Sequence, residues 1–248
     1  MSIHDKNYCA YLVTEISKIV ESNGIFLESG SDFRYFKNAL RKVMKTTQLG
    51  PKFDPDRNDL NGDSALWIIG RNNEGEIVHT QAFCMVDLEN YSLGNYLEER
   101  YVDFIPYLLD KSRSEFLSGP GSSTATGTAC YHGEFMLKRC YSGLQSGAIS
   151  TLLFRLATAS CMVAWSPDII FGFMHSRLIL NGLAAKAGFM HSEPDSITWA
   201  RPDMNRTKKS WIVWLENQDI NHLMKLTAMD LNLPFVDFHQ NMVEKKVA

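Results

Sequence analysis

The sequence lacks the features that mark several large functional classes. It has no apolar run long enough to cross a bilayer, and its start, MSIHDKNYCAYLVTE, carries acidic residues early and lacks the layout of a signal peptide. Its formal net charge is -3. Because phosphate binding normally needs a basic face, this balance argues against nucleic acid as the main partner. We expect a cytoplasmic protein without a membrane span.

Cysteine is sparse, and its pattern argues against both a disulfide framework and a zinc site. The five cysteines form no CxxC pair and are scattered along the chain. An odd, dispersed set favours reduced thiols over a disulfide framework or a zinc site, so no metal is expected. No internal repeat is present either.

The composition that is present indicates an ordinary folded domain. The hydrophobic residues make up 45% of the 248 residues and the charged residues 21%, a balance typical of globular chains. A chain of this length can bury one sizeable core. We therefore expect a single domain over residues 1–248.

Hydrophobic periodicity predicts a mixed order of helices and strands. Helices are expected at 8–22, 32–46, 95–117, 147–163, 178–186 and 218–229, and strands at 65–71, 77–86, 129–141, 168–174, 196–200 and 211–215. The run 50–63 is expected to be a loop, and GPGSSTATGT (119–128) a flexible segment. This order predicts an α/β (α+β) fold around one sheet, with a helical insert around 87–128 and a helical tail at 216–248.

The most informative segment runs from Glu134 to Phe154. A predicted strand leads through a short Ser/Gly turn directly into an apolar helix. The first turn of such a helix has unpaired N–H groups and the positive end of the helix dipole, which together make an anion site suited to a pyrophosphate. The small residues at 146–148 and Ser150 would let a ligand approach the backbone.

This segment resembles the cofactor motif of the GNAT superfamily of N-acyltransferases, Gln/Arg-x-x-Gly-x-Gly/Ala. The chain reads Gln145-Ser-Gly-Ala148-Ile-Ser150, so Ala148 and Ser150 replace the two motif glycines. A helix followed by Gly188-Phe189 and a final hairpin also resembles the close of that fold. The resemblance extends over about residues 65–215 and implies a mixed, mostly antiparallel central sheet flanked by helices.

The resemblance also implies an activity and a set of site residues. Acyl-CoA (acetyl-CoA) would donate an acyl group to a primary amine or amino acid, and Glu134 would be the general base. His175 is a second candidate base at the acceptor cleft, and Tyr141 is a candidate proton donor to the leaving thiolate. The implied cofactor-binding residues are Met136, Leu137, Lys138, Arg139, Gln145, Ser146, Gly147, Ala148, Ile149, Ser150 and Arg177.

Two departures from the family pattern keep other interpretations open. The family's thiolate-protonating tyrosine falls on Ala184, and its asparagine falls on Arg177. A catalytically silent acyl-CoA-binding module is therefore an alternative. The long insert and the acidic loop before the first hairpin resemble acyl-homoserine-lactone and N-acyl amino acid synthases, in which an acyl carrier protein is the donor. A basic face at Lys138, Arg139, Lys208 and Lys209 would favour that alternative.

Several single residues also have plainer explanations. Glu134 is consistent with a solvated strand residue, and His175 with an ordinary core or surface imidazole. Asp54, Asp56 and Asp59 could grip a cation or an amine, but an Asx-rich turn explains them as well. The insert is expected to cover the acyl or acceptor pocket as a lid and not to support the core, although a helix that merely caps the sheet is the alternative.

Overall fold

A computed structural model describes residues 3–43, 49–105, 109–142, 148–203 and 205–226. The strands are β1 (Phe26–Gly30), β2 (Ala65–Arg71), β3 (Ile77–Val86), β4 (Glu115–Phe116), β5 (Ala129–Leu137), β6 (Ile169–His175), β7 (His191–Trp199) and β8 (Lys208–Glu216). The helices are α1 (Ile3–Ser22), α2 (Phe33–Val43), α3 (Leu93–Arg100), α4 (Arg139–Ser142), α5 (Ala148–Ala164), α6 (Ser176–Leu180), α7 (Leu183–Ala187) and α8 (Asn217–Lys225). Three short 3₁₀ turns are η1 (Pro51–Phe53), η2 (Tyr101–Asp103) and η3 (Lys111–Arg113).

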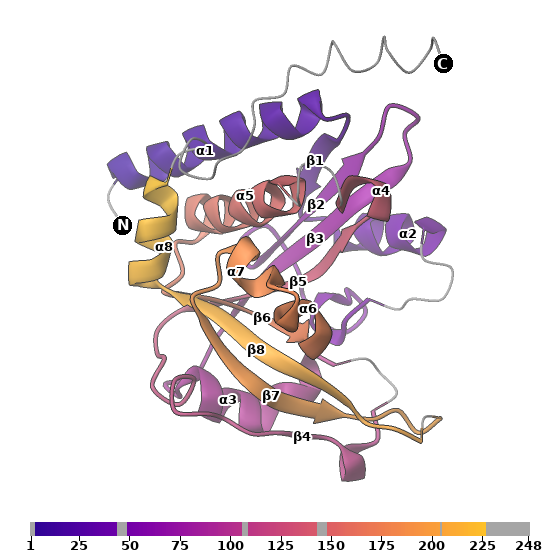
Figure 1. Cartoon of the computed structure of the whole chain (residues 1–248), viewed down its shortest axis with the longest axis vertical. Coiled ribbons are helices and arrows are strands. Elements are labelled where there is room, and N and C mark those ends of the chain that lie inside the picture. Colours follow the sequence, from indigo (N-terminus) through magenta and orange to yellow (C-terminus); the bar gives the residue numbers. More distant parts are fainter. Residues whose placement is uncertain (1–2, 44–48, 106–108, 143–147, 204, 227–248) are drawn as a thin grey trace.

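These eight strands form one sheet in the order β1-β2-β3-β5-β6-β8-β7-β4 (Figure 1). Every neighbouring pair is antiparallel except β5 and β6, which run parallel. A parallel pair needs a crossover connection, and the chain from β5 to β6 contains α5, which supplies it. The expected fold class, a mixed and mostly antiparallel sheet flanked by helices, is confirmed.

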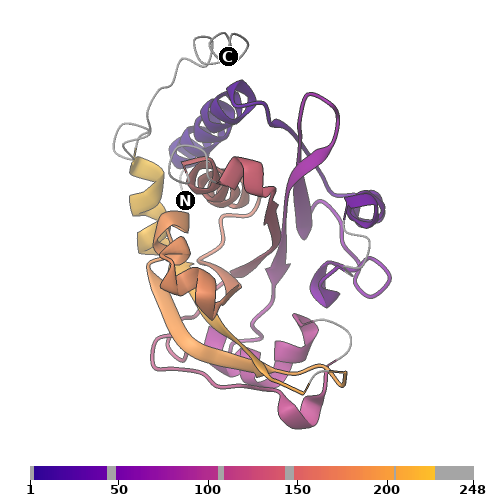
Figure 2. The same ribbon diagram turned by 45° about the vertical axis from the view of Figure 1, so that its right-hand side comes forward.

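Helices cover both faces of the sheet (Figure 2). On one face, α1 and α5 pack over Ile68, Phe83 and Cys130. On the other face, α2 and η1 pack with Phe33, Phe36 and Phe53 in a second hydrophobic cluster. Each fully buried aromatic or branched side chain contributes about 1.5–3 kcal/mol relative to exposure. Among the helices of the described ranges, none has the length and apolarity needed to cross a membrane.

Most expected elements are present, and three predictions were wrong in part. The hairpin of β2 and β3 has the predicted bounds, but strand β1 was not predicted. The helix expected at 178–186 is two short helices, because the chain turns between them at Gly182, whose φ is +79°. The strand expected at 129–141 ends at Leu137, where α4 soon follows.

The third partly wrong prediction is the insert at 87–128. Its α-helix ends at Arg100, and the chain then turns through η2 and η3 to place β4 against β7 at the edge of the sheet. Leu93 and Leu97 are fully buried, and Phe104 and Phe116 belong to the same cluster as α2. The expectation that the insert does not support the core was wrong, because these residues form part of that core.

The glycine-rich run after β4 is held by one buried carboxylate, that of Glu193. Its oxygens accept hydrogen bonds from the N–H groups of Gly119 (2.9 Å), Gly121 (2.8 Å) and Ser122 (2.9 Å), and from the Ser122 hydroxyl (2.5 Å). A Cβ on Gly119 would collide with that carboxylate. The run expected to be a flexible hinge is therefore tied to β7, and glycine is needed where the carboxylate approaches.

Replacing Glu193 should destabilise the whole domain. A charged acceptor that serves three N–H groups is strong, and Glu193→Gln leaves only one acceptor oxygen among several buried donors. We expect the free energy of unfolding, measured by urea titration, to fall by about 2–4 kcal/mol. The control is Glu115→Gln on β4, where the side chain is exposed. Equal stability of the two variants would contradict the assignment.

Candidate active site

A fork between β5 and β6 is the most distinctive feature of the sheet. The two strands pair only from Ala129 to Tyr131 on β5, against Ile169 to Phe171 on β6. Beyond that point β5 stays paired with β3, and β6 stays paired with β8 as far as His175. The facing edges of 132–137 and 172–175 therefore diverge, and no strand of the described chain pairs with either. Such edges can hydrogen-bond an extended ligand that carries amides.

The N-terminus of α5 lies near the open end of this fork, since α5 follows β5 and α4 in the chain (Figure 1). The first three residues of the helix, Ala148, Ile149 and Ser150, are all buried. Ala148 is the first residue of α5, so this end of the helix carries the positive end of the helix dipole. Three other predicted cofactor-binding residues, Gln145, Ser146 and Gly147, lie outside the described residues.

Glu134 occupies an irregular position in β5 beside the fork. The β3–β5 register shifts between Thr80 and Ala82, and Glu134 there has φ of +54°. A left-handed conformation is unfavourable for a residue other than glycine, so neighbouring groups must hold it. The Thr80 hydroxyl donates to the Glu134 carbonyl at 2.8 Å. Local strain of this kind is often found at functional sites.

The Glu134 carboxyl is surrounded by protein although part of its surface stays accessible. Its Oε1 accepts a hydrogen bond from the Gly50 N–H at 2.7 Å. Burial raises the pKa of this carboxyl above its ordinary value, and the Gly50 hydrogen bond only partly opposes that shift. A Cβ on Gly50 would stand 2.9 Å from Oε1, so the close approach requires glycine there. A carboxylate with a raised pKa is a suitable general base.

Aromatic rings form a floor beside Glu134 on the same face of the sheet. Tyr131 stacks on Phe53 with ring centroids 5.2 Å apart and meets Phe104 edge-on at 4.9 Å. Phe173, on the diverging part of β6, lies 6.0 Å from Tyr131. Burial raises the pKa of Tyr131, and the nearby Glu134 raises it further. We name the set Phe53, Phe104, Tyr131 and Phe173 the aromatic floor.

The remaining predicted residues of β5 and α4 border the fork in different ways. The Met136 side chain packs on the same face as the aromatic floor, and Leu137 packs on the α5 face. Lys138 forms an ion pair with Glu76 at 2.8 Å. Arg139 is exposed in α4, and Tyr141 is half-buried against the α5 face, where desolvation raises its pKa.

The predicted residues after β6 have structural roles or are exposed. His175 is exposed and caps α6, because its Nδ1 accepts a hydrogen bond from the Arg177 N–H at 3.2 Å. Arg177 itself is exposed. Ala184 is buried against Met174 and Val213, and its carbonyl accepts from the Phe189 N–H at 3.0 Å. Ala184 is therefore part of the core, beside Met174 on the diverging part of β6.

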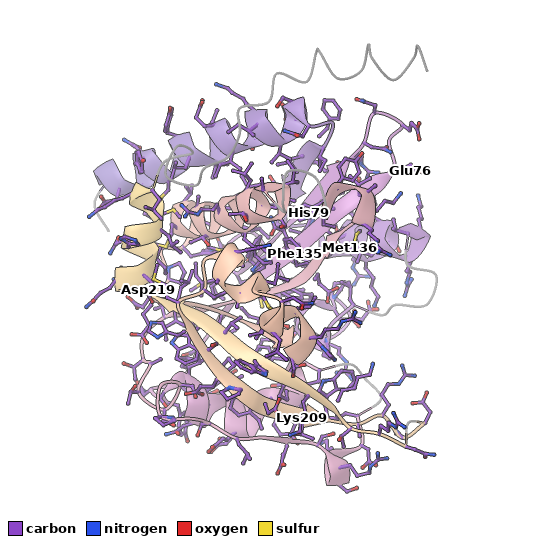
Figure 3. All side chains as sticks on the ribbon, viewed as in Figure 1. Glu76, His79, Phe135, Met136, Lys209 and Asp219 are labelled. Atoms are coloured by element: carbon purple, nitrogen blue, oxygen red, sulfur yellow. The ribbon has the colours of Figure 1, made fainter. Side chains whose placement is uncertain are left out.

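A buried polar cluster on the α5 face was missed by the sequence interpretation. The His79 Nδ1–H donates to the Met136 carbonyl at 2.8 Å, and Figure 3 shows His79, Phe135 and Met136 together where β3 meets β5. His132 stacks on Phe83 with centroids 4.8 Å apart. Alternation along β3 and β5 could have placed both histidines on one face. The β-bulge, which sets their contacts, has no clear sequence signal.

Both histidines are neutral at ordinary pH. Burial lowers the pKa of His79 to about 4 and that of His132 to about 3. Within the described part of the chain, the Nε2 atoms of both rings are buried without a hydrogen-bond partner. Protonating either ring would bury an uncompensated charge.

The acidic residues of the loop before β2 are used within the protein. Lys37 Nζ lies 2.5 Å from an Asp54 carboxylate oxygen and 2.7 Å from one of Asp56, whereas Asp59 is exposed. Asp54 and Asp56 therefore bind Lys37 of the protein itself, and the expectation that they bind a substrate cation was wrong. Among the described residues, no group of three or more His, Cys, Asp or Glu side chains is arranged to hold a metal.

A separate hollow of about 340 Å³ lies between α1, β1, β2 and the second half of α5. Its lining includes Ser17, Ser29, Leu156 and Ser160. Ser160 is about 18 Å along the helix from Ala148, at 1.5 Å per residue. The hollow is thus remote from the fork, and we assign it no role.

No protein-family model and no curated protein sequence matches this chain. Solved structures with a related arrangement include NAA60 of Arabidopsis thaliana in complex with acetyl-CoA, at TM-score 0.45 and 9% identity, over 78% of this chain and 99% of that one. They include the spermidine/spermine N-acetyltransferase SpeG of Vibrio cholerae, at TM-score 0.43 and 8% identity, over 81% and 96%. Escherichia coli ElaA aligns at TM-score 0.41 and 9% identity, over 77% and 99%. At these values, the function has to be argued from the chain's own residues.

The buried histidines should make the protein sensitive to acid. Their pKa values in the folded protein lie below the unfolded value near 6.5, so the unfolded chain binds more protons between pH 6.5 and about 4. Stability should therefore be full above pH 6.5 and fall as the pH drops through that window, by up to about 1.4 kcal/mol per pH unit for each histidine.

Urea titrations at pH 7.5 and pH 5 measure this dependence. His132→Phe keeps an aromatic ring against Phe83 and removes one titrating group. Between pH 7.5 and pH 5, the free energy of unfolding of this variant should therefore fall by about half as much as that of the wild type. His222→Phe, at an exposed position of α8, serves as the control and should behave like the wild type. An unchanged pH dependence in His132→Phe would contradict the neutral buried state.

Proposed function

We propose that this chain is a single-domain GNAT-type N-acyltransferase that transfers an acyl group from acyl-CoA to a primary amine. The observation that carries the proposal is the half-buried carboxylate of Glu134, held in a strained bulge at the edge of a fork beside a helix N-terminus. These features supply a base, a strand edge without a strand partner in the described chain, and an anion site next to one another. An acyl transfer from a thioester with a phosphate-bearing carrier needs all three.

In this proposal the donor lies along the fork. The positive end of the α5 dipole, at Ala148 and Ile149, holds the pyrophosphate together with the predicted residues 145–147. The edge of β5 that diverges from β6, within residues 132–137, pairs with the pantetheine amides and polarises the thioester carbonyl. No metal is needed for these steps.

The chemical step then depends on Glu134. The carboxylate, directly or through a water, takes a proton from the acceptor ammonium, and the free amine attacks the thioester carbonyl carbon. The nitrogen of the tetrahedral intermediate loses its extra proton to water, and the intermediate collapses to the amide with cleavage of the C–S bond. The thiolate that leaves takes up a proton. Because Ala184 has no acidic group and His175 caps α6, we assign the donor of this proton to Tyr141, which water then reprotonates, or to a water.

A CoA donor fits the surface better than an acyl carrier protein does. The basic face that would attract an acidic carrier is partly neutralised within the chain, since Lys138 pairs with Glu76 at 2.8 Å and Lys209 with Asp195 at 2.9 Å. The ammonium of Lys208 lies over the Trp199 ring at 5.2 Å. Charges that are already paired contribute less to steering a partner.

A silent acyl-CoA-binding module is the second candidate. It is favoured by the buried Ala184, which leaves the position of the family tyrosine without an acid. Both candidates bind CoA, so only turnover separates them. A thiol-release assay with acetyl-CoA and a set of amines gives that answer.

Glu134→Gln should abolish most of the turnover without weakening the binding of CoA. Loss of a general base typically costs about 10²–10⁴-fold in rate. In the wild type, the rate should rise with pH through the raised pKa of Glu134, so the acid limb should lie above the ordinary carboxyl range. Thiol release measures turnover, and calorimetry measures CoA affinity.

Stability measurements guard against a trivial loss of folding in Glu134→Gln. Because the folded-state pKa of Glu134 is raised, its ionisation costs stability as the pH rises through that pKa. The amide cannot ionise, so the variant should be at least as stable as the wild type at pH 8. Glu74→Gln, in the exposed turn of the β2–β3 hairpin, is the control. A full rate in folded Glu134→Gln would remove Glu134 from the mechanism.

Ala148→Glu should weaken CoA binding strongly. The substitution places a carboxylate in the first turn of α5, where the proposal puts the pyrophosphate. Ala148→Gln has nearly the same size without the charge and controls for crowding at this buried position. We expect calorimetry to show a dissociation constant at least about tenfold higher for the Glu variant than for the Gln variant. Equal affinities in the two folded variants would place the phosphates elsewhere.

A further inference from the structure

Lys52 carries a positive charge that the described protein does not neutralise. It belongs to η1, is half-buried, and its Nζ lies 5.3 Å from the centre of the Phe104 ring. No carboxylate of the described ranges comes within ion-pair distance of it. The two nearest acidic residues along the chain, Asp54 and Asp56, are both bound to Lys37, at 2.5 Å and 2.7 Å.

This ammonium lies on the same face of the sheet as Glu134. Lys52 is two residues beyond Gly50, whose N–H holds the Glu134 carboxylate at 2.7 Å. From Phe53, in the same turn, ring contacts lead to Tyr131 (5.2 Å) and on to Phe104 (4.9 Å), over which Lys52 lies. The carboxylate of Glu134 and the ammonium of Lys52 are therefore both close to the η1 turn, on the same face of the sheet.

The two charges do not pair with each other. The Glu134 carboxylate accepts a hydrogen bond from the Gly50 N–H, and the Lys52 ammonium contacts the face of the Phe104 ring. Opposite charges held apart over an apolar floor are costly unless solvent or a ligand reaches them. A ligand with an amine at one end and an anion at the other would satisfy both charges.

We infer that the acceptor is an amino acid, whose amine meets Glu134 and whose carboxylate meets Lys52. The inference rests on the proposed function, because Glu134 is the base there. A charge-assisted contact from an ammonium to a carboxylate also orients the amine for attack.

The same site disfavours polyamines and other acceptors with several positive charges. A second ammonium of such a substrate would meet the Lys52 ammonium, and like charges in a partly desolvated site repel each other. Lys52 thus favours primary amines that also carry a negatively charged group over amines that carry a second positive charge.

The test compares phenylalanine with phenethylamine, which differs only by lacking the carboxylate. With acetyl-CoA as donor, wild-type protein should acetylate phenylalanine with a kcat/KM at least about tenfold higher than that for phenethylamine or for the diamine putrescine. Lys52→Met keeps most of the apolar stem and removes the charge. It should raise the KM for phenylalanine about tenfold, with little change in kcat or in the values for phenethylamine.

Two further variants make the outcome specific. Lys111→Met removes an exposed ammonium of the insert and should leave the preference unchanged. Lys52→Glu reverses the charge and should shift the preference from phenylalanine towards putrescine. A Lys52→Met variant that loses activity equally towards phenylalanine and phenethylamine would overturn the inference and leave the proposed function standing.

A binding measurement covers the case in which no amine is acetylated, which would itself contradict the proposed function. Saturation-transfer NMR with phenylalanine and phenethylamine reports binding without turnover. The inference predicts a phenylalanine signal in the wild type that is lost in Lys52→Met and retained in Lys111→Met. Absence of that difference would overturn it independently of catalysis.

Discussion

The divergence of β5 from β6 after three paired residues is the constraint on which the candidate site depends. Each strand keeps its other neighbour, so the sheet is not weakened as a whole, but within the described residues the two facing edges have no ladder partners. Exposed strand edges are normally covered or shortened in proteins. An edge that is kept open inside a sheet, next to the first turn of α5, is best explained by a ligand that completes the hydrogen bonding.

The bulge in β5 connects this fork with the chemistry. The register between β3 and β5 shifts at Thr80, and side chains of β3 there replace backbone donors. The Thr80 hydroxyl donates a hydrogen bond to the Glu134 carbonyl, and the His79 imidazole donates one to the Met136 carbonyl. The result is a carboxylate presented on the aromatic face at a backbone angle that the strand alone would not adopt. On the opposite face, His79 and His132 are buried and neutral. The strands that carry the candidate site therefore also make the stability of the fold sensitive to acid.

The sequence predicts most of the framework but little of the site geometry. The β2–β3 hairpin and α5 follow from alternation and from apolar periodicity, both of which are local. Strand β1, with the sequence FLESG, has no clear alternation and becomes a strand only because β2 pairs with it. The helix expected at 95–117 stops at Arg100, because Phe116 is recruited to the sheet edge by β7. Glu193 could not be linked to residues 119–122 either, since that contact joins distant parts of the chain.

The distance between contacting residues along the chain also explains why Glu134, but not Lys52, is a candidate from the sequence. Glu134 is a candidate because of a resemblance to a family pattern that lies within one strand–helix unit. The role of Lys52 depends on three facts that no local pattern contains: that Gly50 meets Glu134, that Phe104 from the insert lies under the ammonium, and that Asp54 and Asp56 are taken by Lys37. In the proposed site, the insert contributes Phe104. The packing of the insert in the core fixes this ring, and the Lys52 ammonium lies over it.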